Sequence, residues 1–204
     1  MMIQNITDNV VRIYFNGIHT CNSYFIKDRR VLIDMGSLSV AKGLKRSLPV
    51  APEDVSMVLI THMHYDHIGS FSIFPDAPFF ASDTAIRSLQ DNPNEAILDS
   101  ETVQEIYTND FNPRPFPESR LKDIGFTIYE TPGHAKGSVC ILYEDEDSKI
   151  LFSGDLFFDP GMDTTGRTDL PTSDEAEMKV SLRRMSAMRY DILCPGHGKP
   201  SKRR

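Results

Sequence analysis

The sequence predicts an α/β fold that forms one domain over residues 1–204. Apolar, strand-like runs alternate with stretches of helical pattern, and no linker divides the chain. A chain of 204 residues can bury one sizeable core. Four of the strand-like runs are followed within a few residues by His or Asp, and the carboxyl ends of strands are where open α/β sheets place their sites.

In the first half of the chain, short apolar runs predict strands at residues 10–15, 23–26, 31–33 and 57–60. A helical pattern at residues 40–48 ends at Pro49, because the residue before a proline is biased away from helical backbone. Two further helices are expected at residues 83–90 and 95–107. The proline-containing segment 91–119 has two open interpretations, a lid over the site or a packed surface connection.

In the second half, the pattern predicts strands at residues 126–129, 138–142, 150–152 and 192–194, and a helix at residues 173–188. The acidic residues 144–147 separate two strand-like runs and predict a hairpin-type turn. The chain is therefore expected to consist of two αβ halves.

Residues 61–67 read Thr-His-Met-His-Tyr-Asp-His and place four candidate metal ligands in six consecutive positions. A neutral imidazole binds divalent metals at physiological pH, and a carboxylate adds an anionic partner. Three more candidates, His134, Asp155 and His197, each stand beside a glycine past a strand-like run, where glycine lets the backbone turn sharply. We expect all of them to meet at one rim of a sheet. His19, the one histidine outside this set, is interpreted as a polar loop residue.

With these positions in order, the chain resembles the metallo-β-lactamase fold hydrolases from about Asn22 to the C-terminus. The matching positions are His62, His64, Asp66, His67, His134, Asp155 and His197. The resemblance implies a four-layer αββα sandwich, two mixed sheets flanked by helices, with the site at one edge. The chain looks most like the glyoxalase II (hydroxyacylglutathione hydrolase) branch, because residues 165–169 read Thr-Gly-Arg-Thr-Asp. We therefore expect a metal-dependent hydrolase that cleaves a hydroxyacylglutathione-like thioester or a related ester.

The spacing of the ligands suggests how two divalent ions share them. His62 and His64 are two residues apart, so in extended backbone they face the same side and can chelate one ion with His134. The resemblance implies that Asp66, His67 and His197 hold the second ion and that Asp155 bridges both. Zinc is the leading choice, although iron and manganese also suit His and Asp ligands.

Two cations about 3.5–4 Å apart can hold a water as hydroxide at neutral pH, and this hydroxide would attack the substrate carbonyl. Asp66 would orient it and accept its proton, which makes Asp66 the expected catalytic residue.

Arg167 is the expected substrate-binding residue, because glyoxalase II enzymes have a basic residue at the matching point of this loop. A structural ion pair with Asp169 is the alternative interpretation. The chain stops soon after His197 and is expected to lack the C-terminal helical domain of glyoxalase II, so the sequence leaves open whether glutathione thioesters are its preferred substrates.

True β-lactamases often have a cysteine ligand where this chain has Asp155, which argues against β-lactam hydrolysis.

Two other functions remain as alternatives. Persulfide dioxygenases share the fold and the Gly-Arg-Thr-Asp loop and would use one iron at His62, His134 and Asp155, as two-His, one-carboxylate triads do. The second alternative is a metal-binding protein without catalytic activity.

The net charge of −7 argues against a nucleic-acid partner. The absence of a signal-peptide pattern and of any apolar run of about 18 residues predicts a cytoplasmic protein without a membrane partner.

The three cysteines lack metal-site spacing. Cys140 and Cys194 lie in apolar runs and are expected to be reduced core residues, although Cys194 is also three positions before His197, close enough in sequence to approach the metals. Cys21 has no assigned role. The natural acyl group, the thiol carrier and the oligomeric state are not determined by the sequence.

Overall fold

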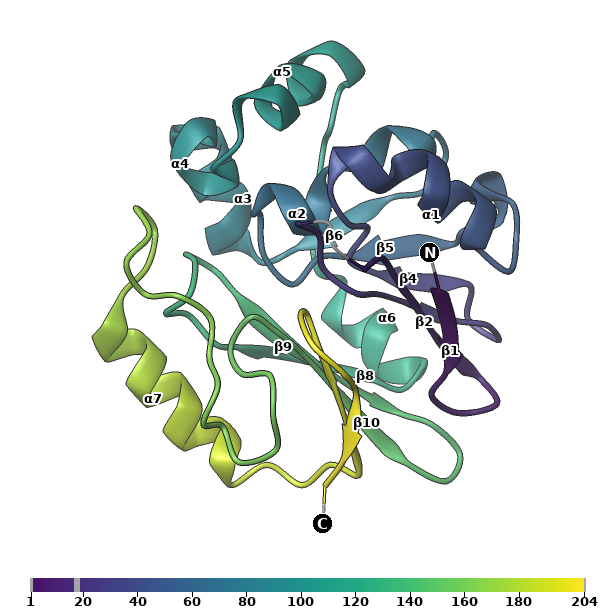
Figure 1. The fold of residues 1–204 in the computed structure, drawn as a ribbon, viewed down its shortest axis with the longest axis vertical. Helices are drawn as coiled ribbons and strands as arrows, with labels where there is room; N and C mark the ends of the chain where they lie inside the picture. Colours follow the sequence, from purple (N-terminus) through teal and green to yellow (C-terminus); the bar gives the residue numbers. More distant parts are fainter. Residues whose placement is uncertain (1, 17–18, 204) are drawn as a thin grey trace.

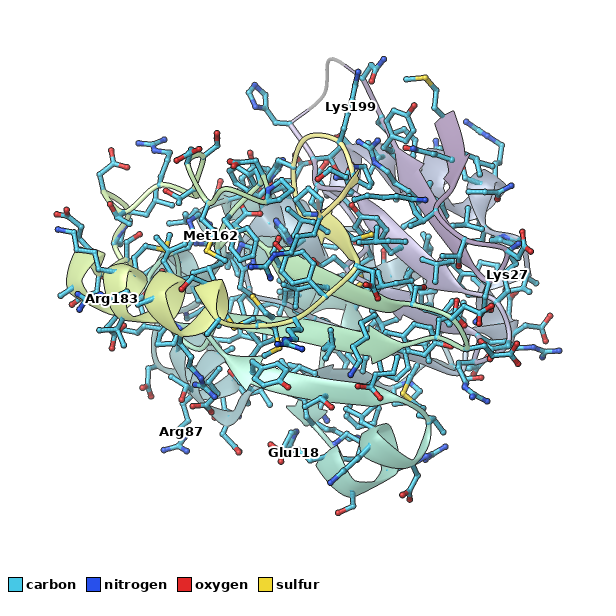
Figure 2. All side chains as sticks on the ribbon, turned by 90° about the horizontal axis from the view of Figure 1, so that it is seen from below. Lys27, Arg87, Glu118, Met162, Arg183 and Lys199 are labelled. Carbon is cyan, nitrogen blue, oxygen red and sulfur yellow. The ribbon has the colours of Figure 1, made fainter. Side chains whose placement is uncertain are left out.

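The computed structural model describes residues 2–16 and 19–203 and contains two mixed β-sheets packed face to face, with helices on both outer faces. Figure 1 shows α1 to α5 above the first sheet and α7 below the second. The predicted αββα sandwich is confirmed. Charged side chains such as those of Lys27, Arg87, Glu118 and Arg183 are exposed at its periphery (Figure 2).

The first sheet has seven strands in sequence order. They are β1 (Met2–Asn5), β2 (Val10–Tyr14), β3 (Ser23–Ile26), β4 (Val31–Ile33), β5 (Met57–Leu59), β6 (Phe79–Ala81) and β7 (Arg114–Pro115). Strands β1 to β4 are antiparallel neighbours, whereas β4 to β7 are parallel. Parallel neighbours need crossover connections, and these carry the helices of the upper layer.

The second sheet has five strands in the order β12-β11-β10-β9-β8. They are β8 (Phe126–Glu130), β9 (Val139–Glu144), β10 (Lys149–Gly154), β11 (Ile192–Pro195) and β12 (Ser201–Lys202). The turn between β9 and β10 is closed by a hydrogen bond from the Asp145 amide to the Ser148 carbonyl, 2.9 Å, as the acidic segment predicted. Strands β10 and β11 are parallel, and their crossover contains α7.

The helices are short, and several begin at a capping side chain. They are α1 (Ala41–Ser47), α2 (Tyr65–Ile68), α3 (Asp83–Asp91), α4 (Pro93–Ile97), α5 (Ser100–Asn109), α6 (Glu118–Asp123) and α7 (Glu175–Ser186), with 3-10 turns at Leu38–Val40, Pro52–Asp54 and Phe71–Ile73. Ser82, Asn92, Asp99 and Asp174 each accept a backbone N–H at the start of a helix, which satisfies donors that have no partner within the helix. In the described ranges, no helix is long and apolar enough to cross a membrane.

The alternation of side chains along each strand produces three apolar layers. On β3, Phe25 faces the upper helices while Tyr24 and Ile26 face the other sheet. On β9, Ile141 faces the first sheet, and Cys140 packs on the α7 side. The two sheets therefore share an apolar interior, and each has a second apolar face that its helices cover.

Some sequence predictions need correction. The helix expected at residues 95–107 is two helices, α4 and α5, which are separated at Leu98 by a left-handed backbone with φ of 66°. Helix α6 and strands β1, β6, β7 and β12 were not predicted. Segment 91–119 is packed and not a free lid, since Ile97, Val103 and Phe111 are buried in the core above the first sheet.

Candidate metal centre

Four loops bring all seven predicted ligands to one edge of the two sheets. His62 and His64 follow β5, and Asp66 and His67 lie in α2. The other three come from the second sheet, with His134 after β8, Asp155 after β10 and His197 after β11. Hydrogen bonds hold the loops of the two sheets together, for example from the Asn22 amide to the Gly196 carbonyl, 2.7 Å.

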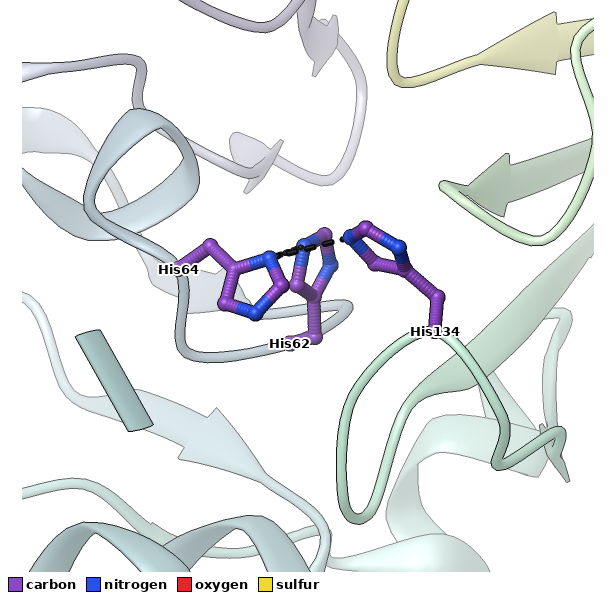
Figure 3. A group of neighbouring side chains, drawn as sticks. All are labelled: His62, His64 and His134. Carbon is purple, nitrogen blue, oxygen red and sulfur yellow. Dashed lines mark hydrogen bonds between the residues drawn. The ribbon is translucent and has the colours of Figure 1, made fainter. Parts of the chain in front are cut away.

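His62, His64 and His134 form the first group, in which three ring nitrogens converge (Figure 3). The Nδ1 of His64 lies 3.1 Å from His62 Nε2 and 2.9 Å from His134 Nε2. A tetrahedral ion with Zn–N bonds of about 2.0–2.1 Å keeps its nitrogen ligands about 3.3 Å apart, so the spacing suits a shared ion.

Hydrogen bonds on the far side of two rings fix their tautomers. His134 Nδ1 donates to the Arg167 carbonyl, 2.9 Å. His62 Nδ1 lies 3.1 Å from Thr61 Oγ1, whose own hydrogen goes to Asp34. Both Nε2 atoms therefore carry lone pairs aimed at His64, and His64 can donate a hydrogen to one of them at most. An ion that accepts all three lone pairs would satisfy them.

Burial keeps this first group in the neutral form that binds metals. It lowers the pKa of His64 to about 3, with a further contribution from His134, and holds the pKa of His62 well below its usual range. Protons therefore do not compete for these nitrogens near neutral pH.

Asp66, His67 and His197 form the second group. Asp66 Oδ2 lies 3.1 Å from His197 Nε2 and 3.9 Å from His67 Nε2. His67 is fully buried, whereas the side chain of His197 is 35% exposed and closes the group toward solvent. Burial opposes ionisation of Asp66, but His67 and His197 lower its pKa, so Asp66 is a carboxylate.

Asp155 lies between the two groups. Its Oδ2 is 3.5 Å from His134 Nε2 and 3.2 Å from His197 Nε2, and its Oδ1 is 3.3 Å from His67 Nε2. A Cβ on Gly196 would lie 2.3 Å from Asp155 Oδ1, so only glycine allows the β11 loop to approach this closely.

Unpartnered buried atoms test whether this arrangement fits a metal. His67 Nε2 and Asp155 Oδ1 are buried 3.3 Å apart without a hydrogen-bond partner. Burial disfavours an imidazolium at His67, but the carboxylates of Asp34, Asp155 and Asp66 raise its pKa well above the usual value. The surroundings therefore require positive charge at this point, and a divalent cation would supply it.

Asp34 is a functional residue that the sequence analysis missed. It follows β4, and its Oδ2 accepts the His67 Nδ1 hydrogen at 2.8 Å. The same carboxylate accepts the Thr61 amide and hydroxyl, both at 2.8 Å. Carboxylates that hold the outer nitrogen of a histidine fix its tautomer and orientation for a metal. Asp34 could have been found, because it follows a predicted strand as the ligands do.

A cavity of about 500 Å³ opens over both groups. Arg167 lies at its rim, where Nε and Nη2 each donate to Asp169 at 2.8 Å. Both side chains are largely exposed, 70% and 68%. The ion pair that was the alternative interpretation of Arg167 is therefore present.

The cysteines divide between the core and the site. Cys194 faces the apolar layer between the sheets. Cys21 lies beside Asp34 and His67, and burial raises the pKa of its thiol to about 12. Its neighbours Asp34 and His67 are joined to each other through His67 Nδ1 and Asp34 Oδ2 at 2.8 Å.

Residues 16–197 match the profile of the metallo-β-lactamase superfamily. The chain belongs to this superfamily. Superfamily members bind divalent metal ions, as the convergence of histidines and aspartates here would suggest. Probable metallo-hydrolase MJ0888 of Methanocaldococcus jannaschii is 30% identical over 195 residues, which cover 88% of each chain.

Two further likenesses are informative. Acyl-coenzyme A thioesterase MBLAC2 of Gallus gallus is 27% identical over 91% of this chain and 75% of its own. The crystal structure of TTHA1623 in a di-iron-bound form superimposes with a TM-score of 0.69 at 22% identity, over 94% of this chain and 93% of that one. This second likeness shows the fold alone.

Proposed function

We propose that this superfamily member is a binuclear metal hydrolase of glyoxalase II type that cleaves a thioester or a related ester. The observation that carries the proposal is the position of Asp155, whose two oxygens lie within 3.5 Å of nitrogens from both histidine groups. Seven donors exceed what one tetrahedral site uses. The ligand division favoured by this geometry is His62, His64 and His134 for one ion and Asp66, His67 and His197 for the other, with Asp155 shared.

Two cations bound there would supply Lewis acidity and lower the pKa of a coordinated water. Asp66 is ionised, lies beside His197 and lines the cavity, so its carboxylate is placed to orient the attacking water and accept its proton. In the reaction, the water oxygen adds to the carbonyl carbon and the carbon–sulfur bond breaks. The products are a carboxylic acid and a thiol that takes up a proton.

Three features support a thioester as the substrate. The cavity of about 500 Å³ has room for a small molecule next to the metals. The loop at residues 165–169 resembles that of glyoxalase II, and one superfamily relative is named an acyl-coenzyme A thioesterase. Zinc is the metal that we propose, with iron or manganese as the alternatives.

The test combines metal analysis with two assays run side by side. Protein purified without added metal is analysed for bound metals, thiol release from an S-2-hydroxyacylglutathione is followed without oxygen, and oxygen uptake is followed with glutathione persulfide. We expect two ions per chain and thiol release. One iron per chain, with oxygen uptake and no thioester cleavage, would exclude the hydrolase and support a persulfide dioxygenase instead.

Asp66→Asn separates catalysis from folding in the same assay. The amide cannot accept the proton from water, so kcat should fall about 100-fold or more while the fold is preserved. The exposed Asp54→Asn serves as the matched control and should keep full activity. A kcat for Asp66→Asn within threefold of the unaltered protein would exclude the proposed proton transfer.

We also propose that Arg167 binds an anionic group of the thiol carrier at the rim of the cavity. Asp169 occupies the Nε and Nη2 edge of the guanidinium, and the second edge remains for a substrate. Arg167→Ala should raise KM with little change in kcat. An unchanged KM would leave Arg167 as a structural partner of Asp169 alone.

A further inference from the structure

The cavity over the metal centre has aliphatic and aromatic side chains in its lining, which we call the apolar wall. Tyr65, Leu98, Phe158 and Leu170 line it, and all four are half-buried. They come from three segments: α2 contributes Tyr65, the α4–α5 junction contributes Leu98, and the loop between β10 and α7 contributes both Phe158 and Leu170. The histidines and aspartates of the candidate metal centre line the same cavity, and the ring of Phe158 packs edge-on against His197 with centroids 5.7 Å apart.

Leu98 reaches this wall through an unfavourable backbone conformation. Its φ of 66° is left-handed, which is rare for a side chain of this size and has a free-energy cost. The conformation is held from both sides, because Ile97 is fully buried and Asp99 caps α5 through the Thr102 amide at 2.7 Å. Strain of this kind persists where the surrounding structure enforces it, and here it places a leucine at the cavity.

The charges around the cavity disfavour an anionic group against this wall. Apart from the histidines, Arg167 is the only basic residue that lines the cavity in the described part of the chain. Its charge is balanced by Asp169, and the pair lies in solvent at the rim. The proposed thiol carrier takes the free edge of Arg167, so no second basic side chain of the described lining remains for a carboxylate at the far end of an acyl chain.

We propose that the apolar wall selects an uncharged, apolar acyl group, with Leu98 as a specificity-determining residue. This inference rests on the proposed function and extends it to the acyl side of the substrate. The acyl chain packs against Leu98, Phe158 and Leu170 while the thiol carrier extends past Arg167 toward solvent. Each methylene removed from water in this way strengthens binding about fourfold.

The first experiment measures kcat/KM for glutathione thioesters that differ only in the acyl group. Hexanoyl should exceed butanoyl by roughly 15-fold, as two buried methylenes predict. Succinyl, which matches butanoyl in length but ends in a carboxylate, should be cleaved more slowly than butanoyl. Equal rates along the series, or a preference for succinyl, would overturn the inference.

Leu98→Asn tests the wall directly, because asparagine tolerates the left-handed backbone but removes the apolar contact. The ratio of hexanoyl to butanoyl kcat/KM should fall toward one. Val180→Asn on the exposed face of α7 is the matched control and should keep the ratio of the unaltered protein. A ratio that Leu98→Asn leaves unchanged would remove Leu98 from substrate selection.

A binding measurement separates this inference from the hydrolase proposal. Acetate, butanoate, hexanoate and succinate are titrated by calorimetry into metal-loaded protein, which requires no turnover. Affinity that rises from acetate to hexanoate in the unaltered protein and not in Leu98→Asn supports the apolar wall even if no thioester is cleaved. Affinity that is flat with chain length, or highest for succinate, overturns the inference whether or not thioesters are cleaved.

Discussion

At the scale of single residues, Asp34 shows that the site extends beyond the atoms that face the metals. Its carboxylate holds His67 by Nδ1 and Thr61 by two hydrogen bonds, and Thr61 in turn contacts His62. One buried carboxylate therefore orients a histidine in each group. The sequence identified the seven candidate ligands through their spacing, but a supporting carboxylate has no spacing of its own and was overlooked.

Asp34→Asn should weaken metal binding by about 10- to 100-fold, because the amide keeps the shape but not the charge that orients His67. The effect should be larger for the ion at Asp66, His67 and His197, where His67 is a ligand. Competition with a chromophoric chelator measures both affinities. The exposed Asp28→Asn is the control, and two undiminished affinities in Asp34→Asn would refute the orienting role.

The two histidine groups should also differ in the protons that they release. In the metal-free protein, burial keeps His64 neutral with a pKa of about 3. For His197 burial acts in the same direction, but hydrogen bonds to Asp155 and Asp66 raise its pKa to about 9. His197 is therefore protonated at neutral pH and must lose its proton before it can bind an ion.

Affinity for the second ion should consequently fall as pH drops below about 9, while affinity for the first should vary little between pH 5 and 8. Calorimetry in buffers of different protonation enthalpy counts the protons released at each step. We expect at least one at the second step and close to none at the first. Equal release at both steps would contradict this assignment of charges.

At the scale of elements, the loops after the strands determine how closely the ligands approach. Eight of the strands, β2 to β5 and β8 to β11, were predicted to within two residues at each end, because their apolar runs are distinct. The break between α4 and α5 was not, since residues 95–107 read as one amphipathic pattern and the left-handed Leu98 is enforced by tertiary contacts. Strands β7 and β12 have two residues each, which is too short for a periodic signal.

Gly196→Ala tests the close approach of the β11 loop. Its Cβ would meet Asp155 Oδ1 at 2.3 Å and His67 Cε1 at 2.9 Å, so Asp155 must move away from both groups. Metal content should fall while the circular dichroism spectrum of the fold stays unchanged. Gly198→Ala is the comparison. Its Cβ would meet nothing within 4 Å, so any loss of metal there would come from backbone strain at the positive φ of residue 198. Full metal content in Gly196→Ala would show that the loop can relax.

At the scale of the whole molecule, the candidate metal centre connects the two sheets. Ligands from β5 and α2 belong to the first sheet, and those after β8, β10 and β11 belong to the second. The sandwich itself followed from the resemblance of the motifs, since no periodicity distinguishes one sheet from two. The three apolar layers became visible only when side-chain directions were known.

Removal of metal should therefore destabilise the whole fold. Each ion at 100 times its dissociation constant contributes about 2.7 kcal/mol, so two ions contribute about 5.4 kcal/mol, which corresponds to a change in Tm of about 11–22 °C for a chain of this size. Thermal unfolding with and without a chelator measures the difference, and added zinc should restore it. A Tm that the chelator leaves unchanged would show that the ions do not stabilise the folded two-sheet structure.

The contact that holds His134 leaves the side chain at position 167 free to vary. His134 is held by the main-chain carbonyl of Arg167 and not by its side chain. Every amino acid offers that same carbonyl, so exchange at position 167 alters what faces the substrate while the histidine keeps its acceptor. Substitutions at position 167 can thus change substrate binding while the hydrogen bond that holds His134 is kept. Selection can therefore alter the substrate preference at this loop without disturbing the metal ligand.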